Sequence, residues 1–367
     1  MIDLTSSTYL GLRHDRAVVP PWGHLTTGVP AVLAAAPQAG PVAAGLAGLV
    51  GARAASLAPS TLHAFWDLFV AFGARPVFVD AGTYPIARWG TERAQCAGAA
   101  VQTFRHHDPG ALSQAMTAVA GPGPLVLTDG LCPGCGGVAP VGDYLDAVRR
   151  RGGTVVIDDT QALGVLGTPA RRHPYGTGGG GTARWAGLSD ANLVIVASLA
   201  KGLGVPLAVV AGGRAAVGRY EARAETRVHC SPPSNAHLSA AIHALRCNAT
   251  RGDELRRHLA GLVTRFRGLL QAQGIPVMAG LFPVQTVQSL PGVDLRAAHR
   301  RLGELGIRAV LHQPRCGPGL ALSFIFTAAH RRAEAEQAAR AVGVALGQSG
   351  AGWSRTRDRT PVWAVTG

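Results

Sequence analysis

Six short apolar segments, separated by stretches of helix length, constrain the fold of this chain most strongly. They span residues 76–80, 99–104, 124–129, 154–158, 193–198 and 207–211. Most are continuous apolar runs, as expected for strands whose two faces are both covered. Strands that alternate with helix-length segments form parallel sheets wrapped by helices. The sequence therefore predicts an α/β fold with a mostly parallel sheet.

The apolar pattern changes near Asp253, where a smaller C-terminal domain is expected. Five apolar residues after this point share one face of a helix that should end near Gly274: Leu255, Leu259, Leu262, Phe266 and Leu269. We expect an N-terminal arm over 1–45, a large domain over 46–245, a small domain over 246–347 and a tail over 348–367. A glycine-rich segment at 168–187 is interpreted as a mobile flap or an insertion.

Charge and composition exclude several classes of function. The net charge is +14, but the arginines are scattered and aromatic residues make up 5% of the chain, which argues against a nucleic-acid partner. The charge instead favours anionic substrates and phosphate. No apolar run is long enough for a membrane span, and the first residues lack the pattern of a secretory signal. We therefore expect a cytoplasmic protein.

Among 35 lysine and arginine residues, Lys201 is the single lysine. Arginine replaces lysine wherever only a positive charge is needed, but it cannot lose its proton and attack a carbonyl carbon. Lys201 follows the strand predicted at 193–198, and a second strand follows it closely. A lysine held between buried strands is desolvated, which lowers its pKa and suits it to Schiff-base formation. The alternative is that Lys201 is a solvent-exposed lysine retained by chance.

Two carboxylates, Asp158 and Asp159, end the strand predicted at 154–158. Ligands of α/β sheets bind outside the carboxyl ends of the strands. A carboxylate there can pair with the pyridinium nitrogen of pyridoxal phosphate (PLP). A purely structural carboxylate is the alternative for Asp158, although an unpaired acid at a buried strand end is costly.

Six cysteines are present, and Cys132 and Cys135 form a C-x-x-C pair. This spacing occurs in redox sites and as half of a zinc site. A zinc site needs a second ligand pair of comparable spacing, and we find none in the sequence. A thioredoxin-like site needs the pair to open a helix early in a small fold. We therefore expect reduced, incidental thiols in a loop and no metal.

Five segments, in order, resemble the α-oxoamine synthases (8-amino-7-oxononanoate synthase and its relatives), which are fold-type I PLP-dependent enzymes of the class I/II aminotransferase superfamily. The segments are S-T-Y-L-G-L at 7–12, T-D-G at 128–130 with G-G-V-A-P at 136–140, D-D-T-Q-A-L-G-V-L-G at 158–167, S-L-A-K-G-L-G at 198–204 and T-A-A-H at 327–330. The resemblance implies a large domain with a mostly parallel seven-stranded sheet wrapped by helices, a smaller C-terminal α/β domain and a homodimer.

The resemblance also implies roles for the catalytic residues. Lys201 is expected to form the Schiff base with PLP and later to move protons at the substrate α-carbon. Asp158 is expected to keep the ring nitrogen protonated, so that the ring withdraws electrons. Tyr9 lies in the segment that resembles the family's substrate-binding arm.

The phosphate of PLP is expected to contact four hydroxyl side chains. The resemblance places Ser198 on the phosphate, together with Ser60 and Thr61 at the start of a helix. Ser231 is expected to reach the phosphate of the neighbouring subunit. From the residues alone, Ser60 also fits a plain helix N-cap and Ser198 a turn residue.

Three positions depart from the family pattern. Tyr84 stands where the family stacks a histidine on the PLP ring, and tyrosine is a poor acid–base group near neutral pH. Gln161 replaces a histidine that touches the ring hydroxyl, and glutamine cannot change charge. The family's carboxylate-binding arginine aligns near His312, and Arg315 is the nearby guanidinium able to bind a carboxylate through two hydrogen bonds.

The resemblance predicts a transferase that condenses an amino acid-derived carbanion with an acyl thioester, carried by CoA or a carrier protein, with loss of carbon dioxide. Tyr84 favours an aminotransferase as the first alternative. A PLP lyase, or a specialised biosynthetic enzyme acting on an unusual amine, is a further alternative. A non-catalytic protein of the same fold is disfavoured by the retained Lys201.

Overall fold

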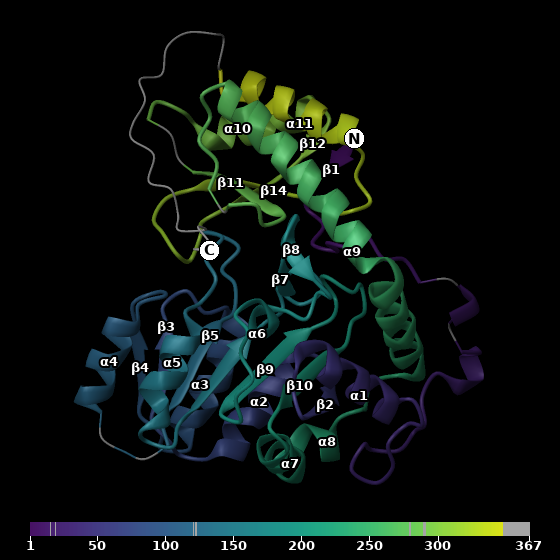
Figure 1. Cartoon of the computed structure of the whole chain (residues 1–367), viewed down its shortest axis with the longest axis vertical. Helices are drawn as coiled ribbons and strands as arrows, with labels where there is room; N and C mark the ends of the chain where they lie inside the picture. The colour runs from purple at the N-terminus through teal and green to yellow at the C-terminus, as the bar shows by residue number, and fades with distance from the viewer. Residues whose placement is uncertain are drawn as a thin grey trace.

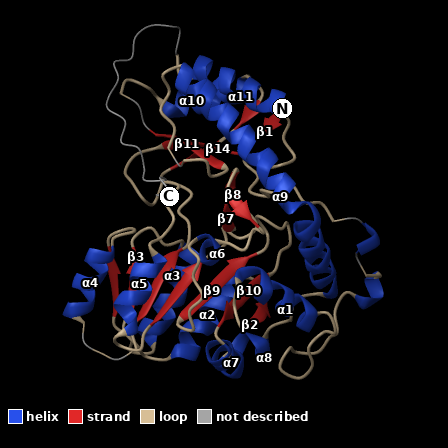
Figure 2. Ribbon diagram, viewed as in Figure 1, coloured by secondary structure: helices blue, strands red, loops and turns tan. Residues whose placement is uncertain are grey.

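A seven-stranded sheet in the order β2-β10-β9-β6-β5-β3-β4 forms the centre of the larger domain in the computed structural model (Figure 2). The structure describes residues 1–14, 16–18, 20–119, 121, 123–278, 280–288 and 291–347. The tail predicted over 348–367 lies outside these residues. The strands of the sheet are β2 (Ala54–Ala58), β3 (Val77–Asp80), β4 (Val101–Phe104), β5 (Leu125–Asp129), β6 (Thr154–Asp158), β9 (Leu193–Ser198) and β10 (Ala208–Gly212).

The predicted mostly parallel seven-stranded sheet is confirmed. Of these strands, β10 is antiparallel to both of its neighbours, and the others run in one direction. Six of the seven strands begin and end within two residues of the predicted bounds. The sequence analysis missed β2, because its residues A-A-S-L-A are small and have little β-propensity.

Helices cover both faces of the sheet, which explains the continuous apolar strands (Figure 2). On β5, Val126 packs in the core on one face, whereas Leu125 and Leu127 pack in the core on the other. The helices of this domain are α1 (Ala39–Val50), α2 (Thr61–Phe72), α3 (Pro85–Cys96), α4 (Pro109–Ala118), α5 (Val141–Arg149), α6 (Thr182–Trp185), α7 (Arg214–Arg223) and α8 (Glu225–His229). Two short 3-10 helices, Arg16–Val18 and Trp22–His24, precede them.

The smaller domain contains an antiparallel sheet in the order β11-β14-β13. Its strands are β11 (Val284–Gln288), β13 (Val310–His312) and β14 (Ala321–Ile325), and its helices are α10 (Leu295–Glu304) and α11 (Arg332–Ala345). The N-terminal strand β1 (Ile2–Asp3) pairs with β12 (Ile307–Arg308) of this domain. The start of the predicted arm therefore lies beside the C-terminal half of the chain (Figure 1).

One long helix, α9 (Asn235–Ala272), joins the two domains (Figure 1). Its first half packs on α1 of the large domain, and its second half packs on α11 of the small domain. The apolar stripe that begins near Asp253 is the second half of this helix, not a new element. The expected domain boundary at 245/246 falls inside α9. No described helix is both long and apolar enough to span a membrane.

The glycine-rich segment at 168–187, which was expected to be a mobile flap or an insertion, contains regular secondary structure between β6 and β9. It forms a hairpin of β7 (Thr168–Ala170) and β8 (His173–Thr177), followed by α6. Its glycines allow close backbone contact. A Cβ on Gly176 would lie 2.5 Å from the Gly167 carbonyl oxygen, and one on Gly180 would lie 2.2 Å from the Leu49 carbonyl oxygen. The glycines thus serve tight packing in an ordered segment.

Candidate active site

Three neighbouring parallel strands each end in an aspartate. Asp80 ends β3, Asp129 ends β5 and Asp158 ends β6, and all three are buried. Asp129 and Asp158 are paired directly across the ladder between β5 and β6. Because the carboxyl ends of parallel strands meet at one edge of the sheet, the fold gathers these acids at the edge where ligands of α/β proteins bind.

Lys201 lies in the turn that follows β9, the strand next to β6. Burial lowers the pKa of Lys201, and the charges of Asp158 and Asp129 oppose this shift. Burial likewise raises the pKa of Asp158, although hydrogen bonding from Thr160 and the charge of Lys201 favour its ionised form. The predicted pair of Lys201 and Asp158 is therefore brought together at one site, where each group opposes the desolvation of the other.

The Lys201 turn is held in place by a close contact between glycines. A Cβ on Gly202 would lie 2.2 Å from the Leu163 carbonyl oxygen and 3.1 Å from Gly164 Cα. Leu163 and Gly164 belong to the loop that follows Asp158. The absence of a side chain at Gly202 thus allows the lysine turn to pack directly on the loop that begins at the aspartate.

Arg315, in the loop between β13 and β14, reaches from the small domain to the large domain. Its Nε donates a hydrogen bond to the Gly82 carbonyl oxygen at 3.1 Å, and its Nη2 lies 3.5 Å from Asp129 Oδ2. The guanidinium carbon stands 4.7 Å from the centroid of the Tyr84 ring, within the range of a cation–π contact. Arg315 is therefore part of the site.

Asp129 lies between these groups. Burial, reinforced by the nearby charge of Asp158, raises the pKa of Asp129 to about 7, against the hydrogen bond from the Tyr84 amide. That amide donates to Asp129 Oδ1 at 3.0 Å. The Tyr84 side chain is 45% exposed at the start of α3, and Arg315 covers one part of its ring. The structure therefore places Tyr84 at the rim of the carboxylate cluster.

Tyr9 and Gln161 meet although 152 positions separate them in the sequence. The Tyr9 hydroxyl donates a hydrogen bond to Gln161 Oε1 at 2.5 Å, and the Tyr9 ring packs edge-on against Phe282. Burial raises the pKa of Tyr9, which keeps its hydroxyl protonated as a donor. The N-terminal segment is thus fixed to the loop that follows Asp158.

Ser198 and the start of α2 lie at the same sheet edge. Ser198 and Ala58 both pair with Ala208 of β10, one from each side. Ser60 is the N-cap residue of α2, and Thr61 is its first residue. The Ser60 hydroxyl lies 2.8 Å from His63 Nδ1 and makes no hydrogen bond to the helix backbone. The first amides of a helix lack intrahelical acceptors and favour anions.

The two remaining predicted residues, His312 and Ser231, have other neighbours, although burial and the charge of Arg315 lower the pKa of His312. His312 Nε2 lies 2.8 Å from the Ser323 hydroxyl on β14. Ser231 follows α8 and lines a surface hollow with Thr26 and Pro30. In this structure Arg315, not His312, makes the contacts with the acids of the site.

Sequence reasoning did not select Asp80 or Asp129 as functional residues. Each was signalled by the same feature that drew attention to Asp158, a carboxylate at the end of a buried apolar strand. What the sequence lacked was the strand order, which makes β5 the neighbour of both β6 and β3.

The chain resembles known proteins over most of its length. The family model described as "Aminotransferase class I and II" matches residues 59–342. The 8-amino-7-oxononanoate synthase of Alkalilimnicola ehrlichii is 31% identical over 258 residues, which cover 70% of this chain and 63% of that protein. The enzyme of the same name from Halorhodospira halophila is 30% identical, with 70% and 62% covered. The match thus spans less than two thirds of the length of these relatives.

Two solved structures share the fold. Serine palmitoyltransferase of Sphingomonas wittichii superposes with a TM-score of 0.81 and 18% identity, covering 94% of this chain and 88% of that one. The 8-amino-7-oxononanoate synthase of Francisella tularensis superposes with a TM-score of 0.76 and 19% identity, covering 94% and 97%.

These similarities and the sheet architecture define the fold of the fold-type I PLP-dependent enzymes. The chain belongs to the class I and II aminotransferase family, as the sequence resemblance predicted.

Proposed function

We propose that this protein is a PLP-dependent transferase that condenses an amino acid-derived carbanion with an acyl thioester and releases carbon dioxide. The observation that supports this proposal most strongly is the placement of the single lysine, Lys201, against the buried carboxylate of Asp158. PLP needs an amine to react with its aldehyde and an acid to pair with its ring nitrogen. Lys201 and Asp158 provide both at the carboxyl edge of the sheet.

The groups around this pair fit the cofactor. Ser198, Ser60 and Thr61 lie at the same sheet edge, where hydroxyl groups and the N-terminus of α2 suit a phosphate dianion. A carboxylate as buried as Asp158 requires a cationic partner, and a protonated ring nitrogen supplies one. Ser231 is proposed to contact the phosphate bound by the neighbouring subunit.

When bound, PLP draws electrons away from the substrate α-carbon. Asp158 holds the proton on the ring nitrogen, because an adjacent cation keeps the buried carboxylate ionised. The Lys201 amine accepts and returns the proton at the α-carbon, and its lowered pKa increases the fraction of neutral amine available as a base. Gln161 accepts a hydrogen bond from the Tyr9 hydroxyl at Oε1, which leaves its amide N–H groups free to donate to the ring hydroxyl of PLP without a change of charge.

Arg315 is proposed to bind the substrate carboxylate. Its guanidinium already lies beside the Asp129 carboxylate, and a fork of N–H donors suits a second carboxylate group. Because the pKa of Asp129 is about 7, protonation of Asp129 near neutral pH frees Arg315 for the substrate. Tyr84 borders the same space and is proposed to stack on the cofactor ring.

The names of the relatives support the acyl thioester as second substrate. The name serine palmitoyltransferase denotes transfer of an acyl group, the palmitoyl group. We propose that the acyl group arrives on CoA or a carrier protein.

A homodimer is also proposed. Leu62 and Trp66 on α2 and Trp89 on α3 are at least 39% exposed, although all three are large and apolar. These two helices pack on each other, so the three side chains belong to one part of the surface. Clustered exposed apolar side chains mark interaction surfaces. Replacement of Trp66 by Glu should convert the dimer to a monomer in sedimentation measurements.

Cofactor binding is tested by absorbance and borohydride trapping. The purified protein incubated with PLP should gain a visible absorption band, and borohydride should fix the cofactor on the peptide that contains Lys201. Lys201→Arg keeps the positive charge but removes the nucleophile, so it is the matched control and should show neither signal. A full band in Lys201→Arg would refute the assigned role.

The reaction is tested by product release. Incubation with an amino acid and an acyl-CoA should release CoA and carbon dioxide together. Tyr84 favours an aminotransferase as the second candidate, because an aromatic side chain replaces the stacking histidine there. That enzyme would convert its cofactor to pyridoxamine phosphate with an amino donor alone and would release no CoA.

A further inference from the structure

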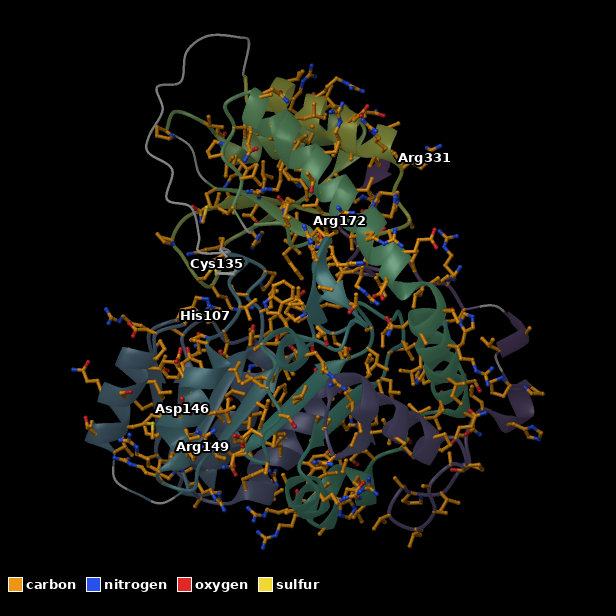
Figure 3. All side chains as sticks on the ribbon, viewed as in Figure 1. His107, Cys135, Asp146, Arg149, Arg172 and Arg331 are labelled. Carbon is orange, nitrogen blue, oxygen red and sulfur yellow. The ribbon has the colours of Figure 1, made fainter. Side chains whose placement is uncertain are left out.

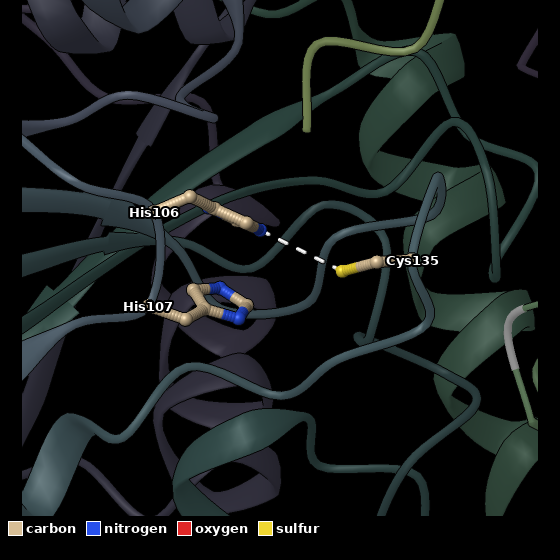
Figure 4. A group of neighbouring side chains, drawn as sticks. All are labelled: His106, His107 and Cys135. Carbon is tan, nitrogen blue, oxygen red and sulfur yellow. Dashed lines mark hydrogen bonds between the residues drawn. The ribbon is translucent and has the colours of Figure 1, made fainter. Parts of the chain in front are cut away.

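Four metal-binding side chains from three distant parts of the sequence converge between the two domains. Cys132 and Cys135 lie in the loop after β5, His106 follows β4, and Cys316 lies in the small-domain loop that carries Arg315. The sulfur atoms of the three cysteines lie within 4.8 Å of one another. His106 Nε2 points at Cys135 Sγ from 3.6 Å, as Figure 4 shows. Figure 3 shows Cys135 between the large sheet and the small domain.

The spacing between His106 and Cys135 matches that of two ligands in a tetrahedral zinc site, and the three sulfur atoms lie within 4.8 Å of one another. With Zn–S bonds of about 2.3 Å and Zn–N bonds of about 2.1 Å, a tetrahedron places two sulfurs about 3.8 Å apart and a sulfur and a nitrogen about 3.6 Å apart. The observed spacing between His106 Nε2 and Cys135 Sγ is 3.6 Å. All six cysteines of the chain are free, so no disulfide occupies the cluster. Three thiolates with one imidazole form a ligand set preferred by structural zinc.

Neighbouring residues fix the positions of these four side chains. His106 Nδ1 lies 2.6 Å from Asp80 Oδ1, so the other ring nitrogen faces the thiols. A histidine that ligates a metal usually donates its second N–H to a carboxylate in this way. The Gly137 amide donates a hydrogen bond to Cys135 Sγ at 3.4 Å. A Cβ on Gly134 would lie 2.7 Å from Cys316 Sγ, so glycine in the C-x-x-C turn admits the third thiol.

We propose that His106, Cys132, Cys135 and Cys316 bind one zinc ion that fastens the small domain to the large domain. This site is separate from the proposed chemistry at Lys201. Cys316 directly follows Arg315, whose guanidinium contacts the Gly82 carbonyl oxygen and the Tyr84 ring. The ion therefore positions Arg315 by holding the next residue along the chain. The expectation of incidental thiols considered only ligand pairs close in sequence, whereas here the fold supplies His106 and Cys316.

Metal content of the full chain tests this proposal. The protein is purified without chelator, dialysed against zinc chloride and then against metal-free buffer, and analysed for metal by mass spectrometry. One zinc per chain is expected in the wild type and in Cys96→Ser, a matched control because Cys96 is exposed at the end of α3. Cys316→Ser and His106→Gln should lose most of the zinc. Wild-type protein without zinc, or Cys316→Ser with a full equivalent, overturns the proposal.

Cobalt provides a second measurement that does not depend on the folding of a variant. Replacement of zinc by Co²⁺ in the wild-type protein should give the strong visible absorption of tetrahedral cobalt–thiolate coordination. His107 stacks on His106 with ring centroids 3.7 Å apart, and its ring nitrogen also lies within 4.8 Å of His106 and Cys135, so it is tested as the alternative ligand. His107→Gln should keep this spectrum and His106→Gln should lose it. The reverse result, or a weak octahedral spectrum in the wild type, contradicts the assigned ligands.

The same samples separate this proposal from the proposed function. Removal of zinc should leave the absorbance of PLP bound at Lys201 unchanged, because no zinc ligand is assigned to the cofactor. It should raise the KM for the amino acid more than it lowers kcat, because Arg315 loses its anchor. If the protein binds zinc but not PLP, the proposed function is refuted and the zinc proposal is unaffected.

Discussion

The replacement of Arg256 by leucine tests how the long helix α9 supports the active site. Arg256 is 2% exposed. Its Nη1 donates hydrogen bonds to the Gly164 carbonyl oxygen and to Asn248 Oδ1, both at 2.8 Å. Its Nη2 lies 2.6 Å from Asp253 Oδ1. Gly164 belongs to the loop that follows Asp158, so this guanidinium ties the interdomain helix to the loop at the site.

The magnitude follows from the groups that lose a partner. Arg256→Leu leaves two buried acceptors, on Gly164 and Asn248, without a donor, and each costs about 1–3 kcal/mol. The Asp253 side chain is 42% exposed, so loss of that ion pair adds no more than about 1 kcal/mol. Contacts made by leucine offset part of the loss. We expect the free energy of unfolding to fall by about 3–5 kcal/mol.

Thermal unfolding followed by circular dichroism measures this loss. For a chain of 367 residues, the expected change lowers Tm by about 4–6 °C. Arg257→Leu is the matched control, because the neighbouring Arg257 is exposed on the same helix and should shift Tm by less than about 1 °C. Equal shifts for the two variants would show that the buried hydrogen bonds of Arg256 do not carry the stability assigned to them.

Three further predictions concern the loops at the strand ends. Gly202→Ala should abolish PLP binding and lower Tm, because its Cβ would lie 2.2 Å from the Leu163 carbonyl oxygen; normal cofactor absorbance would contradict this packing. Burial raises the pKa of Asp159 from 3.8 to about 7. Between these pH values the Asp159 carboxyl is protonated in the folded protein but ionised in the unfolded chain. The free energy of unfolding should therefore fall by up to about 4 kcal/mol as the pH rises from 3.8 to 7. In urea unfolding, the difference between the free energies of unfolding at pH 5 and pH 8 should be smaller for Asp159→Asn than for the wild type. An equal difference in the two proteins would exclude Asp159 as the cause. Asp158→Asn should lower kcat at least about tenfold with an unchanged fold, measured by steady-state kinetics, and full activity would remove Asp158 from its assigned role.

Much of the large domain was predictable because its signals are local. Each segment that the sequence analysis selected forms a strand of the sheet, and all of these strands except the partly exposed β4 are largely buried. The strand β2 escaped notice because its alanines lack the β-branched side chains on which strand prediction depends. The glycines at 176–181 show a related limit of local pattern, because several of them make close contacts in the structure. A glycine that permits close backbone contact and one that permits motion look the same in sequence.

The sequence by itself selected the amine and the acid that are proposed to bind PLP. Lys201 is the single lysine, and Asp158 ends an apolar strand, so both stand out without any knowledge of the fold. Only the tertiary structure decided which distant groups surround them. The strand order sets Asp129 beside Asp158, and the packing of the small domain brings Arg315 to Asp129 and Cys316 to the C-x-x-C pair. Local pattern fixes secondary structure and chemical identity, whereas contacts between distant residues depend on strand order and domain packing, which no short stretch of sequence encodes.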